Sequence, residues 1–259
     1  KPIPEVYTAE PKQEGIRTIT LKRAGQQGIV GVAHKTPSAT DPDAAAFMVL
    51  SSILSSGKNS RFYKNITDKG LTTSVYIWDS LFRDPGLFTV YANLSPDVDH
   101  KTVEEAIVNE YEKIKKDGVS EEEVKKAQSQ LIASMKFSQD GSYAVASGLN
   151  EAIASGDWTL YTTYGDKISA VTKEDIKKIV NKYFLEDLST IGYFVPLGSG
   201  SQGQKAATSA KELEKMKQKH FSTEEESLSS KIIDTEPVKG IRLLTLKRGT
   251  GVVTMRGSM

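Results

Sequence analysis

Apolar and polar residues alternate with the period of a β-strand in several short runs along the first 197 residues. These runs are Ile16–Leu21, Ile29–Ala33, Thr73–Ile77, Leu87–Ala92 and Ser189–Val195. The first two flank a glycine-containing turn at Gly25–Gly28, and the next two flank Asp84-Pro85-Gly86. We therefore expect two β-hairpins, followed much later by a closing strand.

Elsewhere in the same segment apolar residues recur every three or four positions, as they do on the buried face of a helix. The stretches with this spacing are 46–54, 103–114, 124–135, 144–154 and 176–183. Ser120 with Glu123, and Thr172 with Asp175, have the spacing of capping boxes and begin the third and fifth of these helices. This order of elements predicts an α+β domain with a mostly antiparallel sheet covered on one face by helices.

A repeat near the end of the chain sets the domain organisation. Glu14–Arg23 (EGIRTITLKR) returns at Lys239–Arg248 as KGIRLLTLKR, with seven of ten positions identical and a separation of 225 residues. That period is too long for a solenoid, so we interpret it as one domain followed by the first strand of another. We expect the returning strand to pair with the sheet edge of the first domain or with a neighbouring molecule.

The stretch between the two copies is polar. Gly198–Glu226 contains GSGSQGQ and long runs of lysine, glutamate and serine, with hardly any residue able to anchor it in a core. The sequence therefore predicts an α+β domain over residues 1–197 with a lead-in at 1–10. A polar linker over 198–230 and the first strand segment of a following repeat domain over 231–259 complete the chain.

Composition excludes several classes of function. Lys plus Arg total 34 against 33 Asp plus Glu, so there is no net field to attract nucleic acid. The absence of cysteine excludes disulfides, thiolate catalysis and cysteine-ligated zinc, and no run approaches the ~18 apolar residues of a membrane span. We expect no nucleic-acid partner and no membrane span.

The lack of cysteine fits a cytoplasmic and a periplasmic location equally well. Our working hypothesis for the location is a bacterial periplasm or cell envelope.

Motifs that carry chemistry are also missing. The three histidines, His34, His100 and His220, do not have the i, i+4 spacing of a two-histidine zinc site, and each is expected in a surface or capping role. No GxSxG elbow and no phosphate-binding glycine loop occurs. Asp97 and Asp99 lie at a helix start, where they offset the macrodipole. We expect no catalytic residue, metal ligand or cofactor in this chain.

Four segments, taken together in their order and spacing, resemble the M16 family of zinc metallopeptidases. This family includes pitrilysin, insulin-degrading enzyme and mitochondrial processing peptidase, and the resemblance covers about residues 10–197. The segments are Thr40–Asp43 (TDPD), Ile53–Tyr76 (ILSSGKNSRFYKNITDKGLTTSVY), Gly118–Leu131 (GVSEEEVKKAQSQL) and Gly156–Phe184 (GDWTLYTTYGDKISAVTKEDIKKIVNKYF).

The resemblance implies a fold and a place in a larger protein. M16 proteins form a chamber from repeated α+β domains of the metallohydrolase type seen in LuxS and mitochondrial processing peptidase, and only one domain carries the zinc motif HxxEH. This chain has no HxxEH. It is therefore expected to be an inactive, noncatalytic domain that faces the zinc domain of the same or a partner chain, closes the chamber and helps bind a peptide substrate. The parent would be a zinc metalloendopeptidase, with its zinc in another domain.

An alternative remains open, namely a structural or assembly domain of an M16-like protein without peptidase activity. The presence or absence of HxxEH upstream of Lys1 would separate the two. In many noncatalytic M16 domains an arginine and a tyrosine reach the substrate near the zinc, and the matching positions here are Ile66 and Thr73. They are the substrate-facing residues that the resemblance implies, although the usual donors are absent. Arg61 and Tyr63 are expected to be structural.

Overall fold

The computed structural model describes residues 13–197, 232–238, 241–246 and 255–256. The chain divides into two compact units, residues 1–200 and 201–259. The expected lead-in (1–10) and polar linker (198–230) lie outside the described residues.

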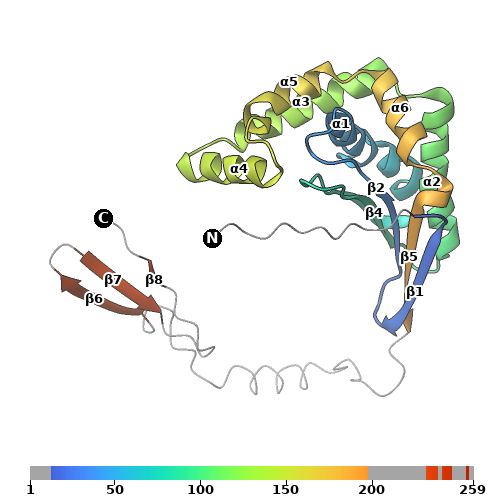
Figure 1. Ribbon diagram of the computed structural model, residues 1–259. Coiled ribbons are helices and arrows are strands. Elements are labelled where there is room, and N and C mark those ends of the chain that lie inside the picture. Colours follow the sequence, from blue (N-terminus) through green and yellow to red (C-terminus); the bar gives the residue numbers. More distant parts are fainter. Residues whose placement is uncertain (1–12, 198–231, 239–240, 247–254, 257–259) are drawn as a thin grey trace, which may run out of the picture. The chain divides into compact units, whose positions relative to one another are not determined.

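A five-stranded sheet forms the centre of the first unit, in the order β1-β5-β2-β4-β3 (Figure 1). Its strands are β1 (Arg17–Ala24), β2 (Ile29–Lys35), β3 (Thr72–Asp79), β4 (Leu87–Leu94) and β5 (Ser189–Leu197). β1 runs parallel to β5, and all other neighbours are antiparallel. The predicted α+β class with a mostly antiparallel sheet is confirmed.

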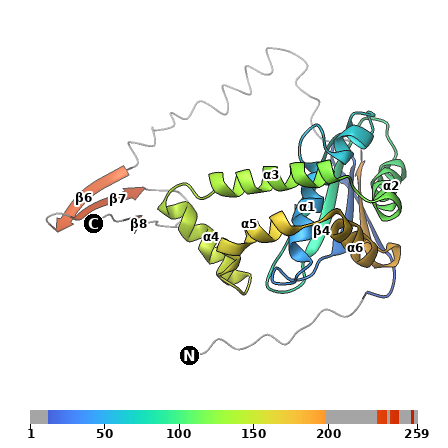
Figure 2. The same cartoon turned by 90° about the horizontal axis from the view of Figure 1, so that it is seen from above.

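Helices pack on the sheet and on one another. They are α1 (Ala44–Ser55), α2 (His100–Asp117), α3 (Glu121–Phe137), α4 (Ser142–Ala154), α5 (Leu160–Ala170) and α6 (Lys173–Tyr183), with a π-helix η1 (Tyr63–Thr67) and a 3-10 turn η2 (Glu186–Leu188). Figure 2 shows α3 and α5 running side by side, with α4 at their far end.

The core lies between the sheet and the helices. Alternate side chains of β2 and β4, such as Val32 and Val90, are fully buried, whereas the residues between them are only half-buried. Phe47, Tyr111 and Phe184 meet these strands from α1, α2 and the end of α6. Burial of each such side chain contributes about 1.5–3 kcal/mol, so this face fixes the fold.

The first predicted hairpin is wrong, because β5 lies between β1 and β2. Phe194 of β5 is paired with Leu21 of β1 on one side and with Ile29 of β2 on the other. The glycine-rich connection therefore spans the end of β5 instead of making a tight turn. At Gly25 a Cβ atom would lie 2.8 Å from the Phe194 ring, so any larger residue would have to displace that ring.

Other local predictions are confirmed. β3 and β4 form the second hairpin. Ser120 with Glu123 and Thr172 with Asp175 both form reciprocal capping boxes, at the starts of α3 and α6. The π-helix η1 and helix α5 were not predicted.

The second unit contains a small sheet in the order β6-β7-β8. Its strands are β6 (Ile232–Val238), β7 (Ile241–Leu246) and β8 (Met255–Arg256). β7 lies in the repeated segment and is a strand, as predicted. Its partners β6 and β8 come from the same unit, which corrects the expected pairing with the first domain or another molecule. A strand two residues away is the partner that costs least loop-closure entropy.

Candidate functional site

The segment that the resemblance marks as substrate-facing runs from η1 into β3. Ile66 in η1 has no exposed surface and belongs to the main core cluster. Burial stabilises an aliphatic side chain, and a side chain without exposed surface cannot contact a substrate. The expectation that Ile66 faces a substrate is therefore corrected.

Thr73 lies in a different environment, at an irregularity of β3. The pairing register with β4 shifts between Thr72 and Ser74, so Thr73 is the extra residue of a β-bulge, and it is exposed. Its Oγ1 accepts a hydrogen bond from Nε2 of Gln27 (2.7 Å) and donates one to the carbonyl of Asn93 (3.3 Å). Bulges re-aim side chains and are frequent beside functional sites. That Thr73 faces a substrate stays a prediction.

β3 is also an edge strand. It is hydrogen-bonded to β4 along one side, and no strand among the described residues pairs with its other side. Tyr76 and Trp78 belong to this strand and have 48% and 64% of their surface exposed. The ring of Tyr76 stacks on that of Tyr91, with 5.3 Å between the ring centroids. An edge strand of this kind can accept an extended peptide through its main-chain groups.

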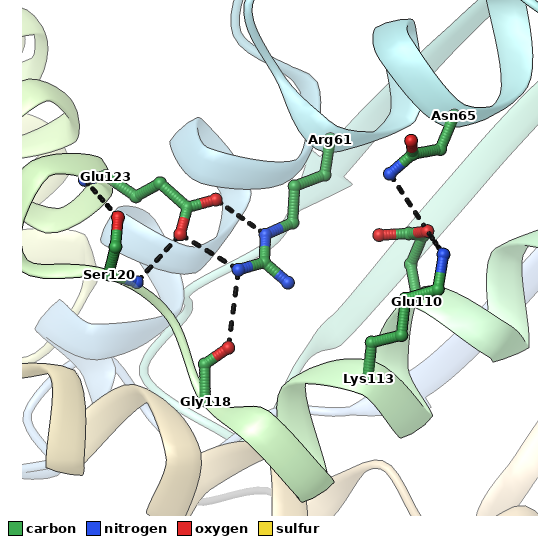
Figure 3. Close-up of polar contacts among 7 residues, drawn as sticks. All are labelled: Arg61, Asn65, Glu110, Lys113, Gly118, Ser120 and Glu123. Carbon is green, nitrogen blue, oxygen red and sulfur yellow. Dashed lines mark hydrogen bonds and ion pairs between the residues drawn. The ribbon is translucent and has the colours of Figure 1, made fainter.

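Arg61 fixes the segment that leads into β3 (Figure 3). Its Nε and Nη2 donate to the two carboxylate oxygens of Glu123, at 2.7 and 2.9 Å, and Nη2 also donates to the carbonyl of Gly118 at 3.3 Å. Glu123 is at the same time the acid of the α3 capping box, accepting from the N–H of Ser120. The hydrogen bonds from Arg61, aided by Ser120, lower the pKa of Glu123 to about 2. Arg61 therefore has a structural role.

A second contact holds the same segment from the side of α2. Glu110 is almost fully buried, and its Oε1 accepts from Nδ2 of Asn65 at 3.0 Å and from Nζ of Lys113 at 2.5 Å (Figure 3). Within η1 the carbonyl of Tyr63 accepts from the N–H of Asp68 at 2.7 Å. Contacts to α2 and α3 thus hold the segment that precedes β3.

The histidines occupy unrelated positions. His34 is buried in the core between the rings of Tyr111 and Phe184, which corrects the expected surface or capping role. Burial, with a smaller effect of Lys115, lowers its pKa to about 4, so it is neutral at pH 7. Nε2 of His100, at the start of α2, makes a 2.8 Å hydrogen bond with the carbonyl of Phe194. His220 lies outside the described residues.

Zinc does not fit the residues that the structure describes. No group of three His, Cys, Asp or Glu side chains there is placed to hold a metal ion. Asp99 serves as the N-cap of α2, accepting from the N–H groups of Lys101 and Thr102.

Among the residues that the structure describes, no helix combines the length and the apolar character that a membrane-spanning segment needs.

Sequence reasoning missed Asp79, the last residue of β3. Its Oδ1 is buried and has no hydrogen-bond partner. Burial raises the pKa of this carboxyl to about 7. The signal was present in the sequence, because Val75, Ile77 and Asp79 occupy alternate positions and so share one face of the strand.

Residues 1–131 match the family model of the Peptidase M16 inactive domain. Zinc protease PqqE of Helicobacter pylori is 27% identical over 198 residues, covering 76% of this chain and 45% of that protein. The crystal structure of a protease from Helicobacter pylori superposes with a TM-score of 0.72 at 26% identity, over 76% of this chain and 48% of the other.

The inactive peptidase domain of a Bordetella parapertussis protein has the same fold. It matches with a TM-score of 0.63 at 24% identity, and the match covers 72% of this chain and 98% of that domain. The present chain thus contains the equivalent of one such domain. It spans about half the length of the Helicobacter proteins that it matches.

Proposed function

The chain belongs to the M16 peptidase family as an example of its inactive domain, and from this premise we propose that it closes the proteolytic chamber of a multi-domain zinc protease and contributes to peptide binding. Zinc and the catalytic residues would come from another M16 domain, in the same chain or in a partner chain. The lack of HxxEH in this sequence supports a noncatalytic role for the chain.

The open edge of β3 carries the peptide-binding part of the proposal. One side of β3 is fixed by β4, and the Arg61–Glu123 and Asn65–Glu110 contacts hold the segment that leads into the strand. Its main-chain groups can therefore pair with an extended peptide at little ordering cost to the protein. Tyr76 and Trp78 supply exposed aromatic surface beside the peptide.

A binding measurement with modified peptides tests this mechanism. A fluorescent, unstructured decapeptide is titrated against the whole chain, in parallel with two versions of the same peptide that carry N-methyl groups at odd or at even positions. Strand addition uses the N–H groups of alternate residues, so one methylated version should lose at least about tenfold in affinity and the other much less. Equal binding of all three peptides, or no binding at all, would favour the structural or assembly role.

Thr73 is tested in the parent protein together with its zinc domain. Thr73→Ala removes one neutral hydroxyl and should lower kcat/KM on a flexible peptide by about fivefold, the equivalent of ~1 kcal/mol. A hundredfold loss would be the size expected for a lost oxyanion-type donor, and would mean that this domain takes part in the chemical step. Gln27→Ala, which removes the partner of Thr73 but no group on β3, is the control.

A further inference from the structure

A cavity of about 800 Å³ lies between α1, α3, α4 and α5, on the helical side of the first unit. Small-molecule sites commonly have volumes of about 300–1,000 Å³, and a water molecule in the liquid takes only about 30 Å³. The space is thus suited to an organic ligand. Asp79, at the end of β3, is the only β3 residue in its lining, and the function proposed above does not use the cavity.

The walls of the cavity combine apolar and hydroxyl groups. Met48, Leu131, Met135 and Tyr161 provide apolar and polarisable surface. Serine hydroxyls from α1 and α3, including those of Ser51 and Ser134, lie among them. Such a lining favours a ligand with an apolar body and few polar groups.

The charged groups of the lining all have one sign. Asp79 from β3 and Glu151 from α4 line the cavity, and none of the described residues around it is Lys, Arg or His. Oδ1 of Asp79 is buried without any hydrogen-bond donor. Because Asp79 borders the cavity and its carboxyl group lacks a donor at Oδ1, a cation in the cavity would stabilise the ionised form of this group.

We propose that this cavity binds a small organic amine with an apolar body, whose ammonium group pairs with the carboxylate of Asp79. The ammonium supplies the charge opposite to that of the Asp79 carboxylate, and the aromatic rings of Tyr161 and Tyr164 give the cation additional favourable surface. Negative ligands are excluded by repulsion from the two carboxylates.

Binding is linked to pH through Asp79. Burial raises the pKa of Asp79 to about 7, and an ammonium ion pairs only with the ionised form. Affinity should therefore rise between pH 5 and about pH 8 and then level off. Three other titratable groups face the cavity: Glu151 on α4, and Tyr161 and Tyr164 on α5. Burial raises the pKa of Tyr164 to about 12, so it stays neutral over this range.

The experiment compares two probes of equal shape, phenethylamine and 2-phenylethanol, by ligand-observed NMR and calorimetry with the whole chain. We expect the amine to bind at least about tenfold more tightly than the alcohol at pH 8, and expect Asp79→Asn to abolish this difference. Asp166→Asn removes an exposed carboxylate from α5 outside the cavity and should change nothing. Equal affinities for the two probes, absence of binding by both, or an unaffected Asp79→Asn variant would overturn the proposal.

Ser134→Trp is the second variant, and it tests the location. Ser134 is exposed on α3 and lines the cavity, so an indole there fills the space without entering the core. The variant should keep the melting temperature of the parent chain and lose binding of the amine. Unchanged amine binding with the fold intact would place the ligand elsewhere and contradict the proposed site.

Discussion

Arg61 joins two segments that are 62 positions apart in the sequence, and its guanidinium group makes a bidentate contact with Glu123. Arg61→Met keeps most of the aliphatic stem but removes all of these hydrogen bonds. We expect a loss of about 2 kcal/mol in the free energy of unfolding, since charge-assisted pairs of partly buried groups are worth ~1.5–3 kcal/mol. Urea denaturation provides the measurement. Lys125→Met, which breaks a highly exposed pair with Glu121, should cost less than about 0.5 kcal/mol.

The same pair predicts a specific acid sensitivity. Arg61 lowers the pKa of Glu123 from 4.5 to about 2, so the unfolded chain takes up a proton at this carboxyl before the folded protein does. The stabilisation is present above pH 4.5 and is lost as the pH falls toward 2. Unfolding curves from pH 6 to pH 2.5 should show a steeper loss of stability in the parent chain than in Arg61→Met. Parallel curves would show that the pair is not formed in solution.

The buried position of Ile66 limits which residues can replace it without loss of stability. Placing arginine there, as the M16 resemblance suggests for a substrate contact, would bury a charge in the core without a partner. Ile66→Arg should therefore destabilise the first unit by about 4 kcal/mol or more, whereas Ile66→Val costs only about 1 kcal/mol. Thr73→Tyr, at the exposed bulge, should fall within about 0.5 kcal/mol of the parent chain. Thermal melts followed by circular dichroism decide the matter, and a stable Ile66→Arg protein would show that the residue can turn outward.

At the scale of elements, helix α6 depends on its capping box. Oγ1 of Thr172 accepts from the N–H of Asp175, and the carboxylate of Asp175 accepts from the N–H of Thr172. Thr172→Ala should cost about 1 kcal/mol in the free energy of unfolding. Thr163→Ala removes a hydroxyl that bonds a carbonyl within α5 and should be close to neutral. Equal effects of the two changes would show that the cap does not matter.

Sequence patterns predict elements well where the signal is local. The capping boxes and the β3–β4 hairpin depend on neighbouring residues, and both were predicted. The pairing of β1 was not, because the position of β5 between β1 and β2 depends on a strand from the far end of the domain. Helix α5 was missed because Thr162, Thr163 and Gly165 lower its helical propensity, so that packing against α3 must stabilise it.

The candidate site was predicted only in part. Arg61 was assigned correctly to structure, since the motif around it continues a helix into a loop. Ile66 was assigned to a substrate surface by resemblance, although an isoleucine with apolar neighbours at helical spacing belongs to the core by its own chemistry. The bulge at Thr73 depends on the register between two strands, and no single segment encodes that register.

At the scale of the whole first unit, two groups of exposed aromatic side chains stand out among the exposed apolar residues. Tyr76 and Trp78 lie at the edge strand β3, and Phe137, Tyr143 and Trp158 lie around the ends of α3 and α4 with exposed fractions of 58–86%. Clustered exposure of this kind marks surfaces that act against another molecule or domain. It supports the proposal that this unit works as one wall of a larger chamber.

The division of the chain into units gives the last prediction. The first unit ends with β5, which pairs with both β1 and β2, so residues up to Leu197 belong to one cooperative sheet. The sequence from Gly198 to Glu226 has only three large apolar residues, Leu213, Met216 and Phe221. Gly156–Phe184, in contrast, includes helices α5 and α6, whose Ile168, Ile176 and Ile179 are fully buried. We therefore expect trypsin to cut first at the lysines of 198–226, because their sequence offers few large apolar side chains that could hold the segment against a core. Mass spectrometry of the early fragments identifies the cuts. Early cleavage between Gly156 and Phe184, with the 198–226 segment spared, would show that the cooperative unit ends before α5 and that β5 does not close the domain.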